Sequence, residues 1–176
     1  MKERNMTISA SKANWYGIGF FIVLYIAARL GFKLIWGEED PAKEISEGYF
    51  ILALVAGFVV HELIHGLGWM LASGCGWKNI SFGFMWSALM PYCHCDVPMR
   101  MKAYRIGGLA PLVILGILPL VFGLAWGSYS LTRFGVFLTI GAIGDIMLIY
   151  LLRHEPADKM VIDHPSEPGC VVYDEE

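Results

Sequence analysis

Charged residues are scarce in this chain. They make up 16% of its 176 residues, against about 25% in typical soluble domains, whereas hydrophobic residues make up 56%. No stripe of lysine and arginine could neutralise a phosphate backbone, and the net charge of −3 also argues against nucleic acid as a partner. Four cysteines, Cys75, Cys93, Cys95 and Cys170, form no framework of the secreted type. The composition therefore favours a membrane protein over a soluble, nucleic-acid-binding or disulfide-stabilised one.

Four stretches are long and apolar enough to cross a bilayer, which requires about 20 residues. They cover residues 15–36, 48–73, 106–127 and 134–152. Arg29 falls near the end of the first stretch, where its long side chain can reach the membrane interface. The sequence predicts an all-α membrane protein whose four transmembrane helices cross the lipid bilayer of the cell membrane.

The segment between the second and third stretches, residues 74–105, differs from the rest of the chain. It shows short β-prone alternation, and Pro91 and Pro98 limit its second half. We expect a small β-hairpin there, on the cytoplasmic side. Residues 1–155 would then form the membrane-embedded domain, and residues 156–176 a cytoplasmic C-terminal tail with one short β-prone piece.

The distribution of basic residues predicts the orientation. If both termini are cytoplasmic, nine lysines and arginines lie on the inner side and four on the outer side, as the positive-inside rule requires. The inner set is Lys2, Arg4, Lys12, Lys78, Arg100, Lys102, Arg105, Arg153 and Lys159, and the outer set is Arg29, Lys33, Lys43 and Arg133.

The second apolar stretch contains His61-Glu62-Leu63-Ile64-His65. Histidines four positions apart lie one above the other on a helix, so both rings can reach one metal ion, and the glutamate can act as general base on a water there. Ionisable side chains inside a bilayer cost roughly 2.5 kcal/mol or more each and are rare there unless they are functional. The pattern therefore predicts a zinc site with His61 and His65 as ligands and Glu62 as the catalytic base. The simpler alternative is a pair of satisfied core histidines beside a glutamate that joins helices.

A catalytic zinc ion needs a third protein ligand. Asp145 is the only ionisable residue in the core of the fourth stretch, and a rise of 1.5 Å per residue puts it at about the depth of the two histidines. Gly141 and Gly144 would let that helix approach the second one closely. Asp145 is therefore the predicted third ligand, with a helix N-cap or kink residue as the alternative interpretation. Weaker ligand candidates outside the helices are His94, Asp96 and Glu155.

The sequence Cys93-His94-Cys95 also invites a metal interpretation. On a strand the two cysteines point one way and the histidine the other, so one ion cannot easily bind all three. The usual spacing of a structural zinc site is absent as well. Ordinary buried thiols are the simpler interpretation.

Three further motifs accompany the histidine motif and its following Gly66. They are Gly108-Leu109-Ala110-Pro111, Gly144-Asp145, and Asp163-His164-Pro165 with Gly169. Together these motifs resemble the membrane-embedded zinc proteases of the site-2 protease type and, more closely, the bacterial family known as putative zincin peptidases. The resemblance extends from about residue 48 to residue 173.

The resemblance implies that His61, His65 and Asp145 are zinc ligands and that Glu62 is the base. One departure concerns the aspartate, which site-2 proteases usually place in a Leu-Asp-Gly context, whereas Ile146 follows Asp145 here.

The sequence therefore predicts an intramembrane zinc metalloprotease that uses Zn²⁺ to hydrolyse peptide bonds of a membrane protein or peptide substrate. Two other functions remain open at this point. One is a non-proteolytic metal-binding protein that stabilises a membrane partner, and the other is a small ion or proton transporter. A transporter would be expected to show an inverted repeat, and none is visible in the sequence.

Overall fold

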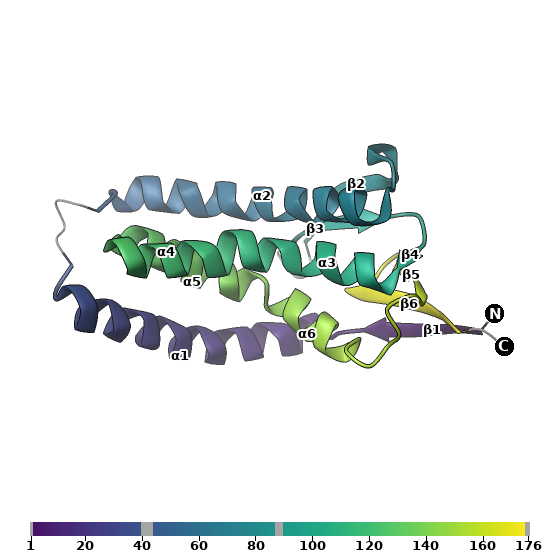
Figure 1. The fold of residues 1–176 in the computed structure, drawn as a ribbon, viewed down its shortest axis with the longest axis horizontal. Helices are drawn as coiled ribbons and strands as arrows, with labels where there is room; N and C mark the ends of the chain where they lie inside the picture. Colours follow the sequence, from purple (N-terminus) through teal and green to yellow (C-terminus); the bar gives the residue numbers. More distant parts are fainter. Residues whose placement is uncertain (1, 40–43, 87–89, 175–176) are drawn as a thin grey trace. The chain divides into compact units, whose positions relative to one another are not determined.

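The computed structural model describes residues 2–39, 44–86 and 90–174, so Lys43 and the hairpin residues 87–89 lie outside it (Figure 1). The elements in chain order are β1 (Lys2–Thr7), α1 (Ala10–Trp36), α2 (Glu47–Ser73), a 3₁₀ turn (Trp77–Asn79), β2 (Ile80–Met85), β3 (Met90–Cys95), β4 (Met99–Arg100), α3 (Met101–Pro111), a π-helix (Leu112–Ile117), α4 (Leu118–Trp126), α5 (Tyr129–Gly141), α6 (Ile143–Leu151), β5 (Met160–Asp163) and β6 (Gly169–Asp174).

Three helical runs are long and apolar enough to cross a membrane: Ser11–Trp36, Glu47–Ser73 and Met101–Trp126. Helices α5 and α6 qualify together as a fourth, broken span. The protein is therefore a membrane protein with three spanning helices, or four if the broken pair is one span. The cytoplasmic location of both termini stays a prediction.

The third and fourth predicted helices are less regular than their apolar patterns indicated. The third run begins at Met101, five residues before the predicted start, because Lys102 and Arg105 near its start interrupt the apolar stretch. It contains a π-helix between Pro111 and Pro119, and proline cannot donate to the carbonyl four residues back. The fourth predicted helix is interrupted at Ala142, between α5 and α6.

Two small antiparallel sheets accompany the helices. Strands β2 and β3 pair with each other in the segment between α2 and α3, and the other sheet has the order β1-β6-β5-β4. In that sheet the first strand of the chain pairs with the last, with Arg4 opposite Val172 (Figure 1).

The prediction of an all-α protein is therefore wrong in one respect, since helices dominate but do not make up the whole fold. The error has a physical cause. Strand β1 and its partner β6 are separated by almost the whole sequence, so no local sequence pattern predicts that they pair. Residues from 156 onward, predicted as a separate tail, supply β5 and β6 to this sheet. The side of the membrane on which the sheets lie stays a prediction.

The chain divides into two compact units. The first contains Met1–Ala13, His61–Pro111 and Gly144–Glu176, and the second contains Asn14–Val60 and Leu112–Ile143. In the second unit, glycines allow close helix contacts. A Cβ on Gly135 would meet the Leu120 backbone nitrogen at 2.3 Å, and one on Gly141 would meet the Phe58 ring at 2.7 Å.

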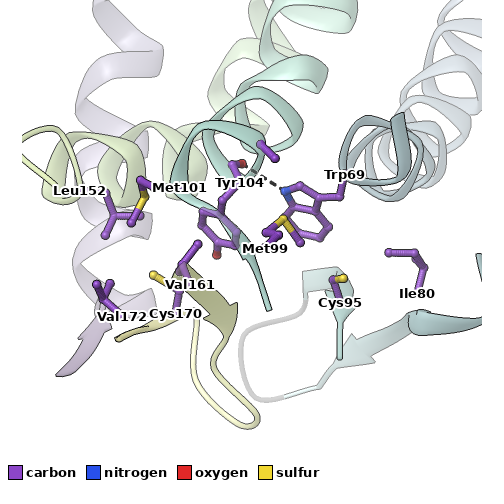
Figure 2. Close-up of a cluster of buried hydrophobic side chains, with 11 residues drawn as sticks. Trp69, Ile80, Cys95, Met99, Met101, Tyr104, Leu152, Val161, Cys170 and Val172 are labelled. Carbon is purple, nitrogen blue, oxygen red and sulfur yellow. Dashed lines mark hydrogen bonds between the residues drawn. The ribbon is translucent and has the colours of Figure 1, made fainter. Parts of the chain in front are cut away.

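The first unit has a core of buried side chains in which both sheets and three helices meet (Figure 2). It contains Trp69 of α2, Tyr104 of α3 and Leu152, which follows α6, with Cys95 from the hairpin. From the C-terminal strands come Val161, Cys170 and Val172. Figure 2 shows the ring of Tyr104 between Trp69 and Val161. The C-terminal segment is thus part of this core.

Within the first unit, α2 and α3 meet at two glycines. A Cβ on Gly68 would lie 2.8 Å from the Cα of Gly107, and a Cβ on Gly107 would lie 2.1 Å from Cδ1 of Trp69. The two backbones can approach so closely only because neither position carries a side chain. By contrast, a Cβ on Gly144 would be 3.8 Å from Ile8, so the predicted helix contact at this glycine is wrong; of the two predicted positions, Gly141 makes a tight contact.

The contact between α2 and α3 makes a prediction about stability. Gly107→Ala should lower the unfolding midpoint in detergent, because overpacking a dense core costs about 1–3 kcal/mol. The matched control is Gly19→Ala in α1, where a Cβ would meet nothing within 4 Å. The control should leave the midpoint unchanged or raise it slightly, because alanine is the better helix former. Equal midpoints for the two variants would contradict the tight contact.

Candidate metal centre

Two buried histidines face each other on α2. His61 and His65 are each 5% exposed, and their rings are one helical turn apart, with centroids 4.8 Å from one another. Their Nε2 atoms approach to 3.1 Å. The helical repeat of 3.6 residues places side chains at i and i+4 on one face, so the spacing in the sequence produces this approach directly.

Asp145 brings a carboxylate to the same point. It lies in the first turn of α6, where the positive end of the helix dipole favours a negative charge. Its Oδ2 is 3.2 Å from Nε2 of His61, and its Oδ1 is 3.4 Å from Nε2 of His65. The structure thus brings together the three residues predicted as ligands. The break in the fourth helix lies at Ala142, three residues before Asp145, so Asp145 is near the break but is not the N-cap of α6.

The tautomer of His65 follows from its second ring nitrogen. Nδ1 of His65 lies 3.0 Å from the carbonyl oxygen of Gly107, which can only accept, so Nδ1 carries the proton and donates. In the neutral ring, Nε2 then presents its lone pair to His61 and Asp145. Such a bond from the far nitrogen to a carbonyl is the usual way in which proteins orient a metal-binding histidine.

The three side chains are close enough to be ligands of one small cation. Zinc–ligand bonds of about 2.0–2.2 Å at tetrahedral angles place neighbouring ligand atoms about 3.3–3.6 Å apart. The two Nε2 atoms are 3.1 Å apart, and the carboxylate of Asp145 reaches His61 with Oδ2 at 3.2 Å and His65 with Oδ1 at 3.4 Å. Two imidazole nitrogens and one carboxylate are also a donor set that zinc uses in catalytic sites. Among the described residues these three side chains form the only group of His, Cys, Asp or Glu with potential ligand atoms within 4.8 Å of one another.

Glu62 lies beside this group without belonging to it. Its half-buried carboxylate is close enough to His61, His65 and Asp145 to interact with their charges, and it also faces the backbone amide of Cys93. Glu62 is thus positioned between the cluster and strand β3.

The direction of the Cys93 amide follows from the pairing of the hairpin. The Asp96 amide donates to the carbonyl of Asn79 at 3.0 Å, and hydrogen-bonded pairs alternate along an antiparallel ladder. The pairs Ile80–Cys95 and Phe82–Cys93 are therefore the non-hydrogen-bonded ones. The amides and carbonyls of Cys93 and Cys95 point away from β2, toward the free edge of β3.

Gly66, directly after the histidine motif, lets the hairpin approach α2. A Cβ there would lie 2.9 Å from Cγ2 of Ile80, 3.2 Å from the Phe82 ring and 3.5 Å from Sγ of Cys93. Only a residue without a side chain fits between the helix and the hairpin at this level.

The weaker ligand candidates do not join the cluster. Nδ1 of His94 lies 3.9 Å from Asp163, and Asp96 is exposed. Glu155 pairs with Arg4 at 3.0 Å in the four-stranded sheet. Burial raises the pKa of the Cys93 thiol and raises that of Cys95 to about 12, and neither thiol is in the group of possible ligands. These features agree with ordinary buried thiols.

Sequence reasoning missed the residues that surround the cluster. Trp69 stacks on His65 with a centroid distance of 5.5 Å, and Gly107 holds the second nitrogen of His65. Nothing in an isolated tryptophan or glycine marks either residue as part of a site. The adjacent pair Gly107-Gly108 at the start of the third span was the available signal.

The geometry can now be compared with known proteins. The sequence profile of the family described as "Putative zincin peptidase" matches residues 54–160. The chain belongs to this family. The family match contains both histidines, Glu62 and Asp145, and it ends three residues before Asp163.

The chain is also similar to a protein of Pyrococcus woesei called the uncharacterized 24.7 kDa protein in gap 5'region. It is 27% identical over 145 residues, which cover 80% of this chain and 62% of that protein. This chain therefore spans less than two thirds of its relative's length. No solved structure matches this member of the zincin peptidase family.

The thiols offer a test of the hairpin. Because only the thiolate reacts, Cys93, Cys95 and Cys170 should label slowly with a maleimide at pH 7.5 in the folded protein, since burial holds their pKa values high. The rate should rise as pH increases and should reach that of free cysteine in denaturant. Mass spectrometry of the labelled peptides measures it. Rapid labelling of Cys95 in the folded protein would contradict its burial.

Proposed function

We propose that this protein is an intramembrane zinc metallopeptidase that hydrolyses peptide bonds of a membrane protein or membrane-bound peptide. The observation that carries the proposal is that His61, His65 and Asp145 bring potential ligand atoms within 4.8 Å of one another, with both histidines in an apolar helix long enough to span a membrane. Membership of the zincin peptidase family supports the same chemistry. A purely structural role would not require a glutamate beside the cluster.

The ligand roles follow from the atoms that face one another. His61 and His65 would bind through Nε2, and Asp145 through its carboxylate, which leaves a fourth tetrahedral position without a protein ligand in the described part of the chain. A zinc ion held there would polarise the scissile carbonyl and make a water molecule acidic enough to lose a proton near neutral pH.

Glu62 is the proposed proton carrier. Its carboxylate lies next to the ligand cluster, so it can accept a proton from the attacking water and deliver it to the leaving amine. Its contact with the Cys93 amide would hold the carboxylate toward the site. Such a positioned base typically contributes about 10²–10⁴-fold to the rate.

Strand β3 is the proposed platform for the substrate. A peptide bond in a helical substrate is shielded by its own hydrogen bonds, so the substrate must unwind before cleavage. An extended segment could then donate to the outward carbonyl groups on the edge of β3 that pairs with no described strand, while the Cys95 amide on that edge stays bonded to Asp163. Because Cys93 on this edge faces Glu62, a segment bound there would run past the catalytic base.

Metal content provides the first test of the proposal. The purified protein should contain about one zinc ion per chain, and His65→Ala or Asp145→Ala should lose most of it. Glu62→Gln should retain the metal because Glu62 is not a ligand. His154→Ala, which removes an exposed histidine outside the cluster, is the matched control and should retain zinc. Zinc-free wild-type protein, or zinc that persists in His65→Ala, would refute the assigned centre.

Proteolysis is tested with the zinc-loaded protein and a synthetic transmembrane peptide that carries a fluorophore and a quencher. Glu62→Gln should lower the cleavage rate by about 10²-fold or more, because it removes the base and leaves the ligands in place. Glu47→Gln makes the same substitution on the same helix at an exposed residue that pairs with Arg133, and should cleave like wild type. If Glu62→Gln cleaves at the wild-type rate, the mechanism fails. A protein that binds zinc but never cleaves would favour the non-proteolytic alternative.

A further inference from the structure

Asp163, at the end of β5, is a buried carboxylate that the proposed mechanism does not use. It is 7% exposed, and each oxygen has one donor: the Cys95 amide reaches Oδ2 at 2.8 Å, and the Tyr104 hydroxyl reaches Oδ1 at 2.7 Å. Burial raises the pKa of this carboxyl group despite the two donors. The desolvation of a carboxylate is costly, so a buried one whose two bonds join separate elements calls for an explanation.

The bond from Tyr104 to Asp163 leads to the metal cluster through stacked aromatic rings. Tyr104 stacks on Trp69 with ring centroids 5.5 Å apart and planes inclined by 14°, and Trp69 stacks on His65 at the same distance with an angle of 21°. The indole Nε1 of Trp69 also donates to the Tyr104 carbonyl at 3.1 Å, the bond drawn in Figure 2. Tyr104, whose hydroxyl group donates to Asp163, is therefore at one end of a stack of rings, and His65, a proposed zinc ligand, is at the other end.

The same tyrosine fixes a second contact to His65. Gly107 lies three residues after Tyr104 on α3, and its carbonyl accepts the proton of Nδ1 of His65. If the first turn of α3 shifts, that carbonyl shifts with it. Gly107 cannot compensate by moving toward α2, because Trp69 already fills the space beside it.

The bond from the Cys95 amide to Asp163 leads to the proposed catalytic base. It holds the outward amide of Cys95, and two residues earlier on the same edge of β3 the amide of Cys93 faces Glu62. Only His94 separates the two cysteines along β3, so anchoring Cys95 also restrains Cys93.

We propose that Asp163 is a positioning residue that joins the two halves of the site, setting His65 through Tyr104 and α3, and Glu62 through Cys95 and β3. This inference rests on the proposed function for the meaning of the site, but its contacts can be tested without catalysis. Asp163 does not touch the proposed ligands; it acts through the elements that orient them.

The experiment measures two quantities on full-length protein in detergent. One is the zinc dissociation constant, from competition with a chelator, and the other is backbone hydrogen exchange in residues 90–95. Asp163→Ala should weaken zinc binding by about 10-fold or more, the usual cost of losing an outer-shell partner, and should increase exchange in β3. Asp163→Asn, which keeps one acceptor oxygen, should show a smaller loss.

Two further variants separate the routes. Tyr104→Phe removes only the bond toward α3, so it should weaken zinc binding and leave exchange in β3 unchanged. Asp174→Asn is the matched control, because it removes a carboxylate of the same sheet whose ion-pair partners, Arg4 at 3.0 Å and Lys159, belong to neither α3 nor β3. It should leave both quantities at their wild-type values even where it lowers the unfolding midpoint.

The outcomes are distinct. The proposal is overturned if Asp163→Ala and Asp163→Asn bind zinc as tightly as wild type, or if Asp174→Asn weakens zinc binding equally, since Asp163 would then act only on the stability of the sheet. Wild-type protein without zinc would overturn both proposals. If wild-type protein binds zinc but cleaves no peptide, only the proposed function is refuted. The role of Asp163 is still tested, because zinc affinity and hydrogen exchange do not depend on cleavage.

Discussion

The Nε2 atoms of His61 and His65 lie 3.1 Å apart on an apolar helix, and the structure of the first unit depends on this short distance. Electron pairs so close together repel unless a proton or a cation lies between them. The two histidines cannot relieve this by moving apart, because consecutive turns of one rigid helix fix their separation. The rest of the unit must therefore supply opposite charge and fixed ring orientations. Asp145 supplies the charge, and the Gly107 carbonyl supplies the orientation of His65.

The ring orientation depends on main-chain atoms and on missing side chains. Gly68 and Gly107 let α2 and α3 approach until a backbone carbonyl reaches His65, and Gly66 does the same for the hairpin. Backbone groups in regular elements have few alternative conformations, so they orient a ligand more firmly than a flexible side chain would. This explains why single added methyl groups at these positions would disturb chemistry as well as packing.

The sequence predicted the grouping of His61, His65 and Asp145 better than it predicted the helices and sheets that surround them. The spacing of His61 and His65, and an isolated aspartate at similar depth, were enough to bring three side chains together, because helical geometry and the cost of buried charge act locally. The apolar stretches also located the spanning helices. The break at Ala142 and the π-helix were not predicted. Hydrophobicity indicates which residues lie in the membrane, but it does not indicate the pattern of backbone hydrogen bonds within a helix.

The four-stranded sheet was beyond sequence reasoning for a different reason. Its strands come from both ends of the chain, and pairing between distant segments leaves no periodic pattern. The role suggested for Asp163 was invisible for the same reason, since its two partners precede it by 68 and 59 residues.

The pairing of β1 with β6 has a consequence for the order of assembly. Arg4 bonds to Asp174 across 170 residues, so the first strand to be synthesised waits for the last one described. Ribosomes deliver the N-terminal end first, and the spanning helices can enter the bilayer while translation continues. The sheet that carries Asp163 closes only afterwards. The histidines and the aspartate can thus enter the bilayer before the four-stranded sheet next to them has paired.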